Sequence, residues 1–369
     1  MAKIVIISHY APSLINFRGE LIKTFVKLGH HVITLGPEGG FEEDLKALGA
    51  EYKQIPLERT GVNPLKDIST ILFLVKILRE IKPDYVLSYA IKPVIYGSLA
   101  ASLAGIPNIY SMITGLGYIF TGHSIKQRAI YNLIYPMLKK ALKRNKIIFF
   151  QNPDDRKLFR DLYLVSSKQK MIIINGSGVN ISYFAYSPAP TQPLSFLLMA
   201  RLIWDKGIGE YVQAARNLKR RYPFVDFKLL GPFDSNPKAI ERSFVEQWAS
   251  EGIIKYFGET KDVRPYIVNS SVFVLPSYRE GTPRSVLEAM SMGRPIITTD
   301  APGCRETVIN GVNGFLVPVK DVGALEKAME KFILQPELIP KFGLASRKIA
   351  EEKYDVNKVN KIIIEAMGL

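Results

Sequence analysis

Two carboxylates that lie eight positions apart frame the segment with the clearest capacity for chemistry, Glu280-Gly-Thr-Pro-Arg-Ser-Val-Leu-Glu288. Thr282 is a favourable N-cap and Pro283 suits a first helical turn, so a helix is predicted to begin between the carboxylates. The N–H groups of a first turn favour an anion. Carboxylates that accept hydroxyl hydrogens beside such a site suit a ligand that is both sugar and phosphate. The alternative is a pair of solvent-facing Glu residues.

Two cations follow a predicted strand earlier in the chain, in Met199-Ala-Arg-Leu-Ile-Trp-Asp-Lys-Gly207. Arg201 offers a planar fork of donors and Lys206 a compact point charge. Together they could clamp a diphosphate leaving group and neutralise the charge that develops on it. A solvated basic loop is the alternative, but the position at a strand end, in the same half as Glu280 and Glu288, favours the functional interpretation.

The length and composition limit which classes of protein this chain can belong to. A chain of 369 residues exceeds one typical core, so two domains are expected. The single cysteine, Cys304, excludes an intramolecular disulfide and fits a reducing compartment. One Cys and four scattered His residues suggest no metal site, and no cofactor is expected. The N-terminal residues resemble a first strand and not a secretory signal.

Short apolar runs alternate with helical patterns, which predicts an α/β fold with parallel sheets. Strands are expected at 4–8, 31–35, 85–88, 108–111, 147–151, 196–200, 226–230, 254–257, 272–275 and 295–298, and helices at 18–28, 66–81 and 93–104. In this interpretation residues 1–180 form an N-terminal Rossmann-like domain, and residues 181–193, with three prolines, form a linker. A second Rossmann-like domain at 194–350 follows, and then a C-terminal helix at 351–369 that packs back on the first domain.

Two such domains are expected to face one another across a cleft, with ligands beyond the carboxyl ends of the strands. The turn after the first strand has no Gly-x-Gly-x-x-Gly, so a dinucleotide-dependent oxidoreductase is disfavoured.

Positive charge is concentrated in the first half of the chain. Residues 1–180 contain 24 Lys and Arg against 13 Asp and Glu, whereas the remainder contains 25 against 21. Seven basic residues and no acidic one lie between 126 and 146, interleaved with an apolar stripe that includes Leu133, Leu138 and Leu142. This pattern predicts a helix that lies on an anionic membrane surface; a core-packed helix with a basic outer side is the alternative. The expected contacts are Lys126, Arg128, Lys139, Lys140, Lys143 and Arg144.

Four ordered motifs carry a family resemblance: ARLIWDKG, then Gly231-Pro232, then LPSYREGTPRSVLEAMSMGRPIITTD, then GCRETVINGVNGFLV. Together they resemble the C-terminal half of a family 4 retaining glycosyltransferase with the GT-B fold. In the first half, SHYAPSLINFRGELIK, SYAIKPVIYGSLAA, ITGLGYIF and INGSGVN resemble enzymes that extend undecaprenyl-diphosphate-linked sugars, of the N-acetylgalactosaminyltransferase type.

The resemblance implies a role for each matching residue. Arg201 and Lys206 would hold the nucleotide diphosphate, Glu280 would contact donor sugar hydroxyls, and Glu288 would accept from the ribose hydroxyls. Backbone N–H groups around Gly281, Thr282, Pro283 and Arg284 would meet the phosphate or sugar. Many relatives carry a large apolar residue at the Thr282 position.

Acceptor-binding candidates lie in the first half: His9, Asn16, Arg18, Lys92, Gly115 and Gly117. Local turns, or a solvated Arg18, are the alternatives. Many relatives have a donor-contacting His near Ile91 that this chain lacks.

The sequence therefore predicts a glycosyltransferase that moves a sugar, for example an N-acetylhexosamine, from a UDP-sugar to an undecaprenyl-diphosphate-linked saccharide. Such an enzyme would be cytoplasmic and peripheral on the inner face of the cell membrane, and would bind no nucleic acid. A UDP-sugar epimerase or hydrolase of the same fold and a transferase with a soluble acceptor remain as alternatives.

Overall fold

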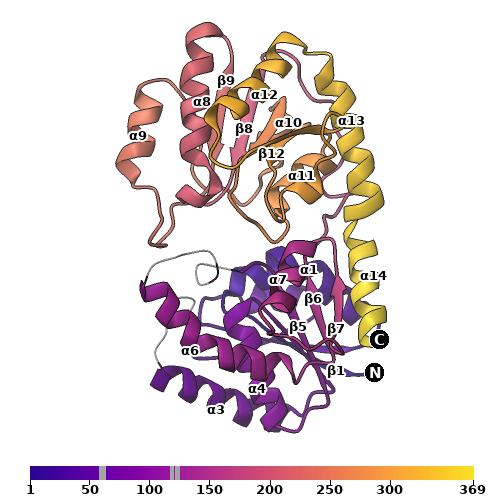
Figure 1. The fold of residues 1–369 in the computed structure, drawn as a ribbon. Coiled ribbons are helices and arrows are strands. Elements are labelled where there is room, and N and C mark those ends of the chain that lie inside the picture. The colour runs from indigo at the N-terminus through magenta and orange to yellow at the C-terminus, as the bar shows by residue number, and fades with distance from the viewer. Residues whose placement is uncertain (58–63, 117–119, 121–124) are drawn as a thin grey trace. The chain divides into compact units, whose positions relative to one another are not determined.

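The computed structural model describes residues 1–57, 64–116, 120 and 125–369. They divide into two compact units, the first comprising residues 1–177 and 359–369 and the second residues 178–358 (Figure 1). Each unit holds a parallel sheet covered by helices on both faces, as the alternation of strand and helix patterns predicts.

The first unit is built on a parallel sheet whose described strands run in the order β3-β2-β1-β4-β5-β6-β7. They are β1 (Lys3–Ile7), β2 (His31–Gly36), β3 (Glu51–Gln54), β4 (Tyr85–Tyr89), β5 (Asn108–Ile113), β6 (Ile147–Phe150) and β7 (Lys170–Ile173). The chain adds strands on one side of β1 and then on the other, so the loops after β1 and β4 diverge. Ligands of open parallel sheets bind at such a point.

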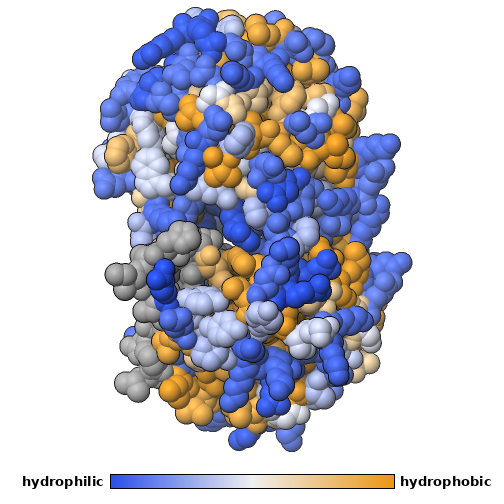
Figure 2. Space-filling view, in the orientation of Figure 1, coloured by the Kyte–Doolittle hydropathy of each residue, from blue (hydrophilic) through white to orange (hydrophobic). Residues whose placement is uncertain are grey.

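Helices cover both faces of this sheet: α1 (Ala11–Lys27), α2 (Glu42–Ala47), α3 (Pro64–Ile81), α4 (Ile91–Leu103), α6 (Ile125–Leu142), α7 (Pro153–Asp161) and the end of α14 (Val356–Met367). Alternate strand residues separate the two cores. Val5 and Ile7 join the core that α3, α4 and α6 cover, whereas Ile4 and Ile6 join the core of α1 and α14. On the surface over α3, α4 and α6, hydrophobic and hydrophilic residues lie side by side (Figure 2).

The second unit holds described strands in the order β10-β9-β8-β11-β12-β13, again parallel. They are β8 (Ser195–Met199), β9 (Asp226–Leu230), β10 (Lys255–Tyr256), β11 (Val272–Leu275), β12 (Ile296–Thr299) and β13 (Gly314–Val317). Its helices are α8 (Ile208–Arg221), α9 (Arg242–Ser250), α10 (Arg264–Val268), α11 (Arg284–Ser291), α12 (Val322–Leu334) and α13 (Leu338–Ile349), with short 3-10 turns at Trp204–Lys206 and Arg305–Thr307 and a π-helical turn at Ala350–Tyr354.

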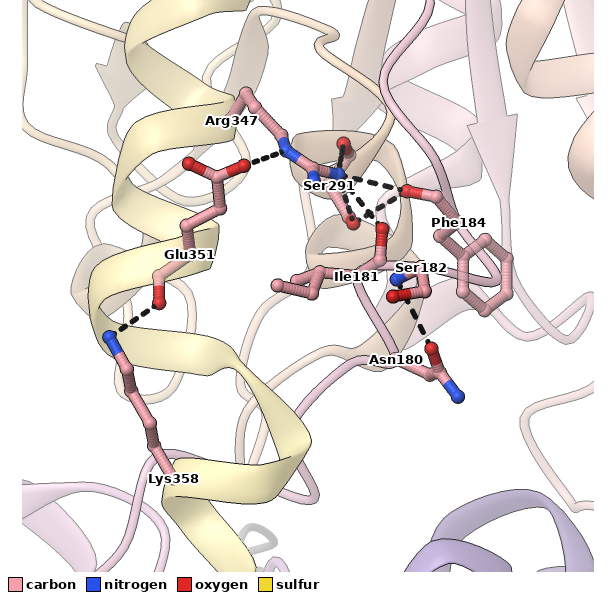
Figure 3. A network of polar contacts seen from close by, with 8 residues as sticks. All are labelled: Asn180, Ile181, Ser182, Phe184, Ser291, Arg347, Glu351 and Lys358. Atoms are coloured by element: carbon pink, nitrogen blue, oxygen red, sulfur yellow. Dashed lines mark hydrogen bonds and ion pairs between the residues drawn. The ribbon is translucent and has the colours of Figure 1, made fainter.

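The segment 181–193, expected to be a linker, packs on the second unit instead. Phe184 is buried in its core. Arg347 donates from Nη1 to the carbonyl oxygens of Ile181 at 3.1 Å and Phe184 at 3.2 Å, and to that of Ser291 in α11 at 2.7 Å (Figure 3). The buried Arg294 holds the Ser187 carbonyl oxygen at 2.8 Å. Two arginines of the second unit therefore bind carbonyl groups in the first part of this segment, at the turn of residues 181–184 and at Ser187, before the prolines begin.

Candidate active site

Arg201 and Lys206 lie on the loop after β8, where the sequence places them. Gly207 follows in a left-handed conformation, with φ of +72°, and a Cβ atom there would lie 2.1 Å from the carbonyl oxygen of Pro276. Only glycine permits this close approach. It brings the loop after β8 against the loop after β11, and Tyr278 N–H donates to the carbonyl oxygen of Asp205 at 2.9 Å.

Lys206 and Glu280 form an ion pair, in which Lys206 Nζ donates to Glu280 Oε1. Both side chains are largely buried. The Glu280 backbone N–H donates to the carbonyl oxygen of Pro302 at 2.9 Å, so the loop after β12 also fixes this position. The structure therefore brings together two residues that the sequence analysis proposed separately as diphosphate and sugar contacts.

Arg201 has a carboxylate partner that the sequence analysis missed. Its Nη1 lies 2.6 Å from Oδ2 of Asp234, which is almost fully buried, while Arg201 itself is partly exposed. Asp234 comes from the loop after β9, next to β8 in the sheet. A second bridge joins the same two loops, from Lys238 Nζ to Asp205 Oδ2 at 2.7 Å. Its position in the sequence could have pointed to it, because Asp234 is an acidic residue three positions after Gly231, just beyond a predicted strand.

Glu288 lies on α11 and pairs with Arg284 one turn earlier, with 2.8 Å between Arg284 Nε and Glu288 Oε1. Burial away from water raises the pKa of Glu288, and the Arg284 guanidinium opposes part of that rise. Of the predicted donor-binding residues, Arg284 is thus the one that contacts Glu288. Gly293 follows the helix with φ of +80°, as predicted for its end.

The start of α11 differs from the prediction by one residue. The helix begins at Arg284, and Pro283 is the N-cap residue, with extended φ of −73° and ψ of 110° and no side-chain cap hydrogen bond. Thr282 was predicted as the cap and lies one position before it. Gly281 and Thr282 therefore belong to the loop that carries Glu280, because Pro283 takes the position where the chain turns into the helix.

Three acceptor candidates of the first unit follow neighbouring strands. His9 lies beyond the end of β1, Lys92 in the first turn of α4 after β4, and Gly115 beyond β5. Lys92 Nζ lies 3.6 Å from Oδ1 of Asp67 on α3, and 5.7 Å from the centre of the Tyr96 ring. The carboxyl ends of β1, β4 and β5 share one edge of the sheet.

The remaining acceptor candidates differ in accessibility. Asn16 is exposed on α1. Arg18 is only 2% exposed, so the alternative of a solvated arginine is wrong. Its guanidinium carbon lies 5.0 Å from the centre of the Tyr89 ring, and the Tyr89 hydroxyl shares a hydrogen bond of 2.7 Å with Ser13. Gly117 lies outside the described residues.

The predicted basic helix is α6, and its apolar stripe is mostly part of the core. Leu138 and Leu142 are fully buried, and Ile134 and Met137 pack against the same core. The prediction that this stripe faces a membrane is therefore wrong for those residues, because they are packed into the core that α6 shares with α4. Arg128, Lys139, Lys140, Lys143 and Arg144 are exposed, whereas the Lys126 side chain lies outside the described residues.

The described residues contain no cluster of three or more His, Cys, Asp or Glu side chains arranged to hold a metal ion. No helix within them has the length and apolar character needed to cross a bilayer.

Family models match both halves of the chain. A model described as glycosyl transferase 4-like matches residues 15–152, and one described as glycosyl transferases group 1 matches residues 193–335. The second match contains Arg201, Lys206, Glu280 and Glu288.

Curated relatives are similar over most of the chain. The N,N'-diacetylbacillosaminyl-diphospho-undecaprenol alpha-1,3-N-acetylgalactosaminyltransferase of Campylobacter jejuni is 28% identical, over 91% of this chain and 90% of its own length. The UDP-Gal:alpha-D-GlcNAc-diphosphoundecaprenol alpha-1,3-galactosyltransferase of Escherichia coli is 25% identical, over 74% of this chain and 73% of its own.

Solved structures match the fold over nearly the whole chain. A glycosyltransferase from Rickettsia africae superposes with a TM-score of 0.78 at 19% identity, covering 99% of this chain and 97% of its own. HepE of Anabaena, solved with UDP and glucose, gives a TM-score of 0.79 at 16% identity and covers 100% of both chains. The chain therefore belongs to the glycosyltransferases and has the GT-B fold, with a first half of the 4-like type and a second half of group 1.

Proposed function

We propose that this protein transfers a sugar, with retention of anomeric configuration, from a UDP-sugar to an undecaprenyl-diphosphate-linked saccharide. The names of the Campylobacter and Escherichia coli relatives support this acceptor class, and both describe transfer to an undecaprenyl-linked sugar diphosphate. The names of the E. coli relative and of the Anabaena complex support a UDP-sugar donor. The product would be a lipid-linked intermediate of polysaccharide or glycan synthesis.

The ion pair between Lys206 and Glu280 is the observation that carries the proposal. A nucleotide-sugar presents anionic phosphate oxygens next to sugar hydroxyls, and this pair presents a cation next to a hydrogen-bond acceptor. When a donor binds, the phosphate replaces Glu280 as the partner of Lys206. The Glu280 carboxylate then accepts hydrogen bonds from the sugar hydroxyls.

The chemistry follows from the same groups. The bond between the anomeric carbon and the phosphate oxygen breaks, and the acceptor hydroxyl oxygen forms a bond to that carbon on the same face. The hydroxyl proton passes to the departing phosphate oxygen. Arg201 and Lys206 stabilise the charge that grows on the diphosphate, so the proposal needs no metal ion. Glu288 holds the ribose hydroxyls.

The test is a transfer screen of UDP-sugars, N-acetylhexosamines first, against undecaprenyl-diphosphate-linked monosaccharides. We expect one UDP-sugar to be consumed with formation of a glycoside whose anomeric configuration, read by NMR, matches that of the donor. Release of free sugar would identify a hydrolase, and a changed UDP-sugar an epimerase. An inverted product would contradict retention, and transfer only to water-soluble sugars would contradict the lipid-linked acceptor.

The cellular location is part of the proposal. A lipid-linked acceptor lies in a membrane, and UDP-sugars are cytoplasmic, so we place the protein peripherally on the inner face of the cell membrane. The exposed cations of α6 support this placement, since each cation near anionic lipid contributes about 1 kcal/mol to binding.

A further inference from the structure

The segment after β9, residues 231–240, runs along the loop that follows β8. The two strands are neighbours in the sheet (Figure 1), and backbone contacts between their chains continue beyond the strand ends. Leu202 N–H donates to the carbonyl oxygen of Pro232 at 2.9 Å, and Ile240 N–H donates to the carbonyl oxygen of Leu202 at 2.9 Å. Leu202 is thus held from both ends of this segment, which we call the 231–240 loop.

Asp234 lies in the 231–240 loop, and both of its carboxylate oxygens accept hydrogen bonds. Oδ1 accepts from the backbone N–H of Asn236 at 2.8 Å, and Oδ2 accepts from Nη1 of Arg201 at 2.6 Å. The first bond closes a local turn and fixes the carboxylate relative to the loop backbone. The guanidinium of Arg201 therefore takes its position from an acceptor that is itself held in place.

The exposed fractions of the two side chains show which of them can meet a ligand. The Asp234 side chain is 6% exposed and the Arg201 side chain 43%. Removing the cation from a buried carboxylate is costly, because water does not replace the lost partner. The guanidinium carries further N–H donors besides the one in this bond. The bond to Asp234 and a bond from the exposed part of Arg201 to a ligand can therefore exist together.

This arrangement differs from that of the neighbouring cation. In the proposed complex Glu280 releases Lys206 and turns to the sugar, whereas Asp234 is buried and bonded to its own turn. Asp234 would therefore stay with its arginine when the donor binds. Its remaining role is to orient the planar guanidinium, and orientation matters because Arg binds phosphate oxygens through donors in a fixed geometry.

We infer that Asp234 is a positioning residue of the donor site, which orients Arg201 toward the diphosphate of the nucleotide-sugar. The inference rests on the proposed function, in which Arg201 contacts that diphosphate. Asp234 acts through the arginine and does not touch the donor.

The competing role of Asp234 predicts an effect of opposite sign. If Asp234 only competed with phosphate for Arg201, removing its charge would strengthen the binding of an anionic ligand, because like charges repel. If it orients the arginine, the same change weakens binding.

Asp234→Asn separates the two roles. The Asn side chain has nearly the same shape, and its Oδ1 can still accept the Asn236 N–H, so the turn is kept while the ion pair with Arg201 is lost. We expect UDP and inorganic diphosphate, each titrated by calorimetry, to bind about tenfold more weakly, the scale for a hydrogen bond to a charged group. Unchanged or tighter binding would overturn the inference.

The matched control is Asp226→Asn, at the other end of β9. Asp226 also forms an ion pair, with 2.7 Å between its Oδ2 and Nζ of Lys255. This variant should bind both probes as the wild type does. An equal loss of affinity in the two variants would mean that any lost ion pair on this strand weakens binding, which would contradict a specific role for Asp234.

A double substitution distinguishes positioning from a structural role. In Arg201→Met there is no guanidinium to orient, and Lys206 remains to hold the diphosphate. Adding Asp234→Asn to that protein should cause no further loss of affinity, so the two effects are not additive. Full additivity would show that Asp234 acts independently of Arg201, and the inference would fail.

Asp234→Glu gives the same decision if the Asn variant does not fold. It keeps the negative charge and moves the carboxylate outward by one methylene group. Weaker binding of UDP and diphosphate supports positioning, because the arginine is displaced. Wild-type affinity contradicts it, because the charge alone would then be sufficient.

Failure of the proposed function would be seen in the wild-type protein. A wild-type protein that binds neither UDP nor inorganic diphosphate would overturn the proposed donor, and this inference with it. A wild-type protein that binds them, together with an Asp234→Asn variant of equal affinity, would overturn this inference alone.

Discussion

The burial of Glu288 raises the pKa of its carboxyl group, and this affects both folding and the proposed ligand binding. A carboxyl group whose pKa is raised in the folded state binds a proton more readily there than in the unfolded chain. The contribution of Glu288 to the free energy of unfolding is therefore fully present at low pH and is lost as the pH rises through the raised pKa. In the proposed complex the ribose hydroxyls donate to ionised Glu288, so the ionised form would be costly for the free protein and useful once the donor is bound.

The pH dependence of donor binding follows from this. We expect UDP affinity of the wild type, relative to Glu288→Gln, to increase as the pH rises from about 5 towards neutrality, with a midpoint above the ordinary Glu value of 4.5. Calorimetry with both proteins at each pH gives the ratio of their two UDP affinities. Protonation of UDP itself affects both affinities equally and therefore cancels in this ratio. A ratio that stays flat would remove Glu288 from the ribose site.

Lys206 should affect the chemical step. In the proposed reaction Lys206 neutralises charge on the departing diphosphate, so we expect Lys206→Ala to lower kcat by roughly a hundredfold or more. Lys327→Ala, an exposed cation of the same unit, is the control and should leave kcat unchanged. An unaltered kcat in the Lys206 variant would show that the charge on the leaving group is stabilised elsewhere.

The positions of Arg201, Lys206 and Glu280 after strands, and of Glu288 on a helix, could be predicted because strand ends and helix starts have local signatures. Their roles toward a donor stay predictions. Asp234 could not be assigned to Arg201, because the two are 33 positions apart and meet only when β8 and β9 pair.

At the scale of elements, the loop after β11 is fixed by the loop after β12. Gly303 has φ of +82°, and a Cβ atom there would lie 2.2 Å from the carbonyl oxygen of Glu280. No side chain fits without moving the backbone that carries Glu280. The position of this carboxylate thus depends on a glycine 23 positions further along the chain.

Gly303→Ala should therefore weaken donor binding as well as stability. The strained φ costs about 1 kcal/mol or more, and the displaced loop should raise the Kd for UDP-sugar. Gly311→Ala is the matched control, because Gly311 has φ of +77° but open space around its Cβ position. It should lose stability and keep its affinity. Equal affinities in both variants, measured by calorimetry, would show that Gly303 does not position Glu280.

The elements themselves were largely predictable. The expected strands of both sheets match the observed ones to within one or two residues, because buried parallel strands form continuous apolar runs. Helix α1 begins at Ala11, seven positions before the predicted start, since Pro12 suits a first helical turn. Strands β3, β7 and β13 were missed. The Glu51–Gln54 sequence of β3 gives no strand pattern because it is mostly polar and exposed at the sheet edge.

At the scale of the whole molecule, charge is distributed unequally. The net charge of +15 belongs mainly to the first half, where Arg128, Lys139, Lys140, Lys143 and Arg144 are exposed in and just after α6. Fields of this kind concentrate a protein near anionic surfaces and weaken as salt is added.

Replacing Lys139, Lys140, Lys143 and Arg144 with Gln should release the protein from anionic vesicles at low salt. Each cation contributes about 1 kcal/mol near such a surface, so the combined loss is large. Four Gln substitutions of the exposed cations Arg220, Lys327, Lys341 and Lys348 form the control of equal charge in the second unit. Unchanged cosedimentation of the α6 variant would place the lipid contact elsewhere.

The C-terminal residues of α14 bear on the order in which a newly made chain can fold. Val359, Ile363, Ile364 and Met367 belong to the same core as Ile4 and Ile6 of the first strand. Domains generally fold in the order in which they are synthesised. Here the first unit, although begun earlier, leaves part of its core uncovered until α14 has been made. The N-terminal unit is thus the last to close, and until its final helix emerges it is the part of the chain that a chaperone would have to shield.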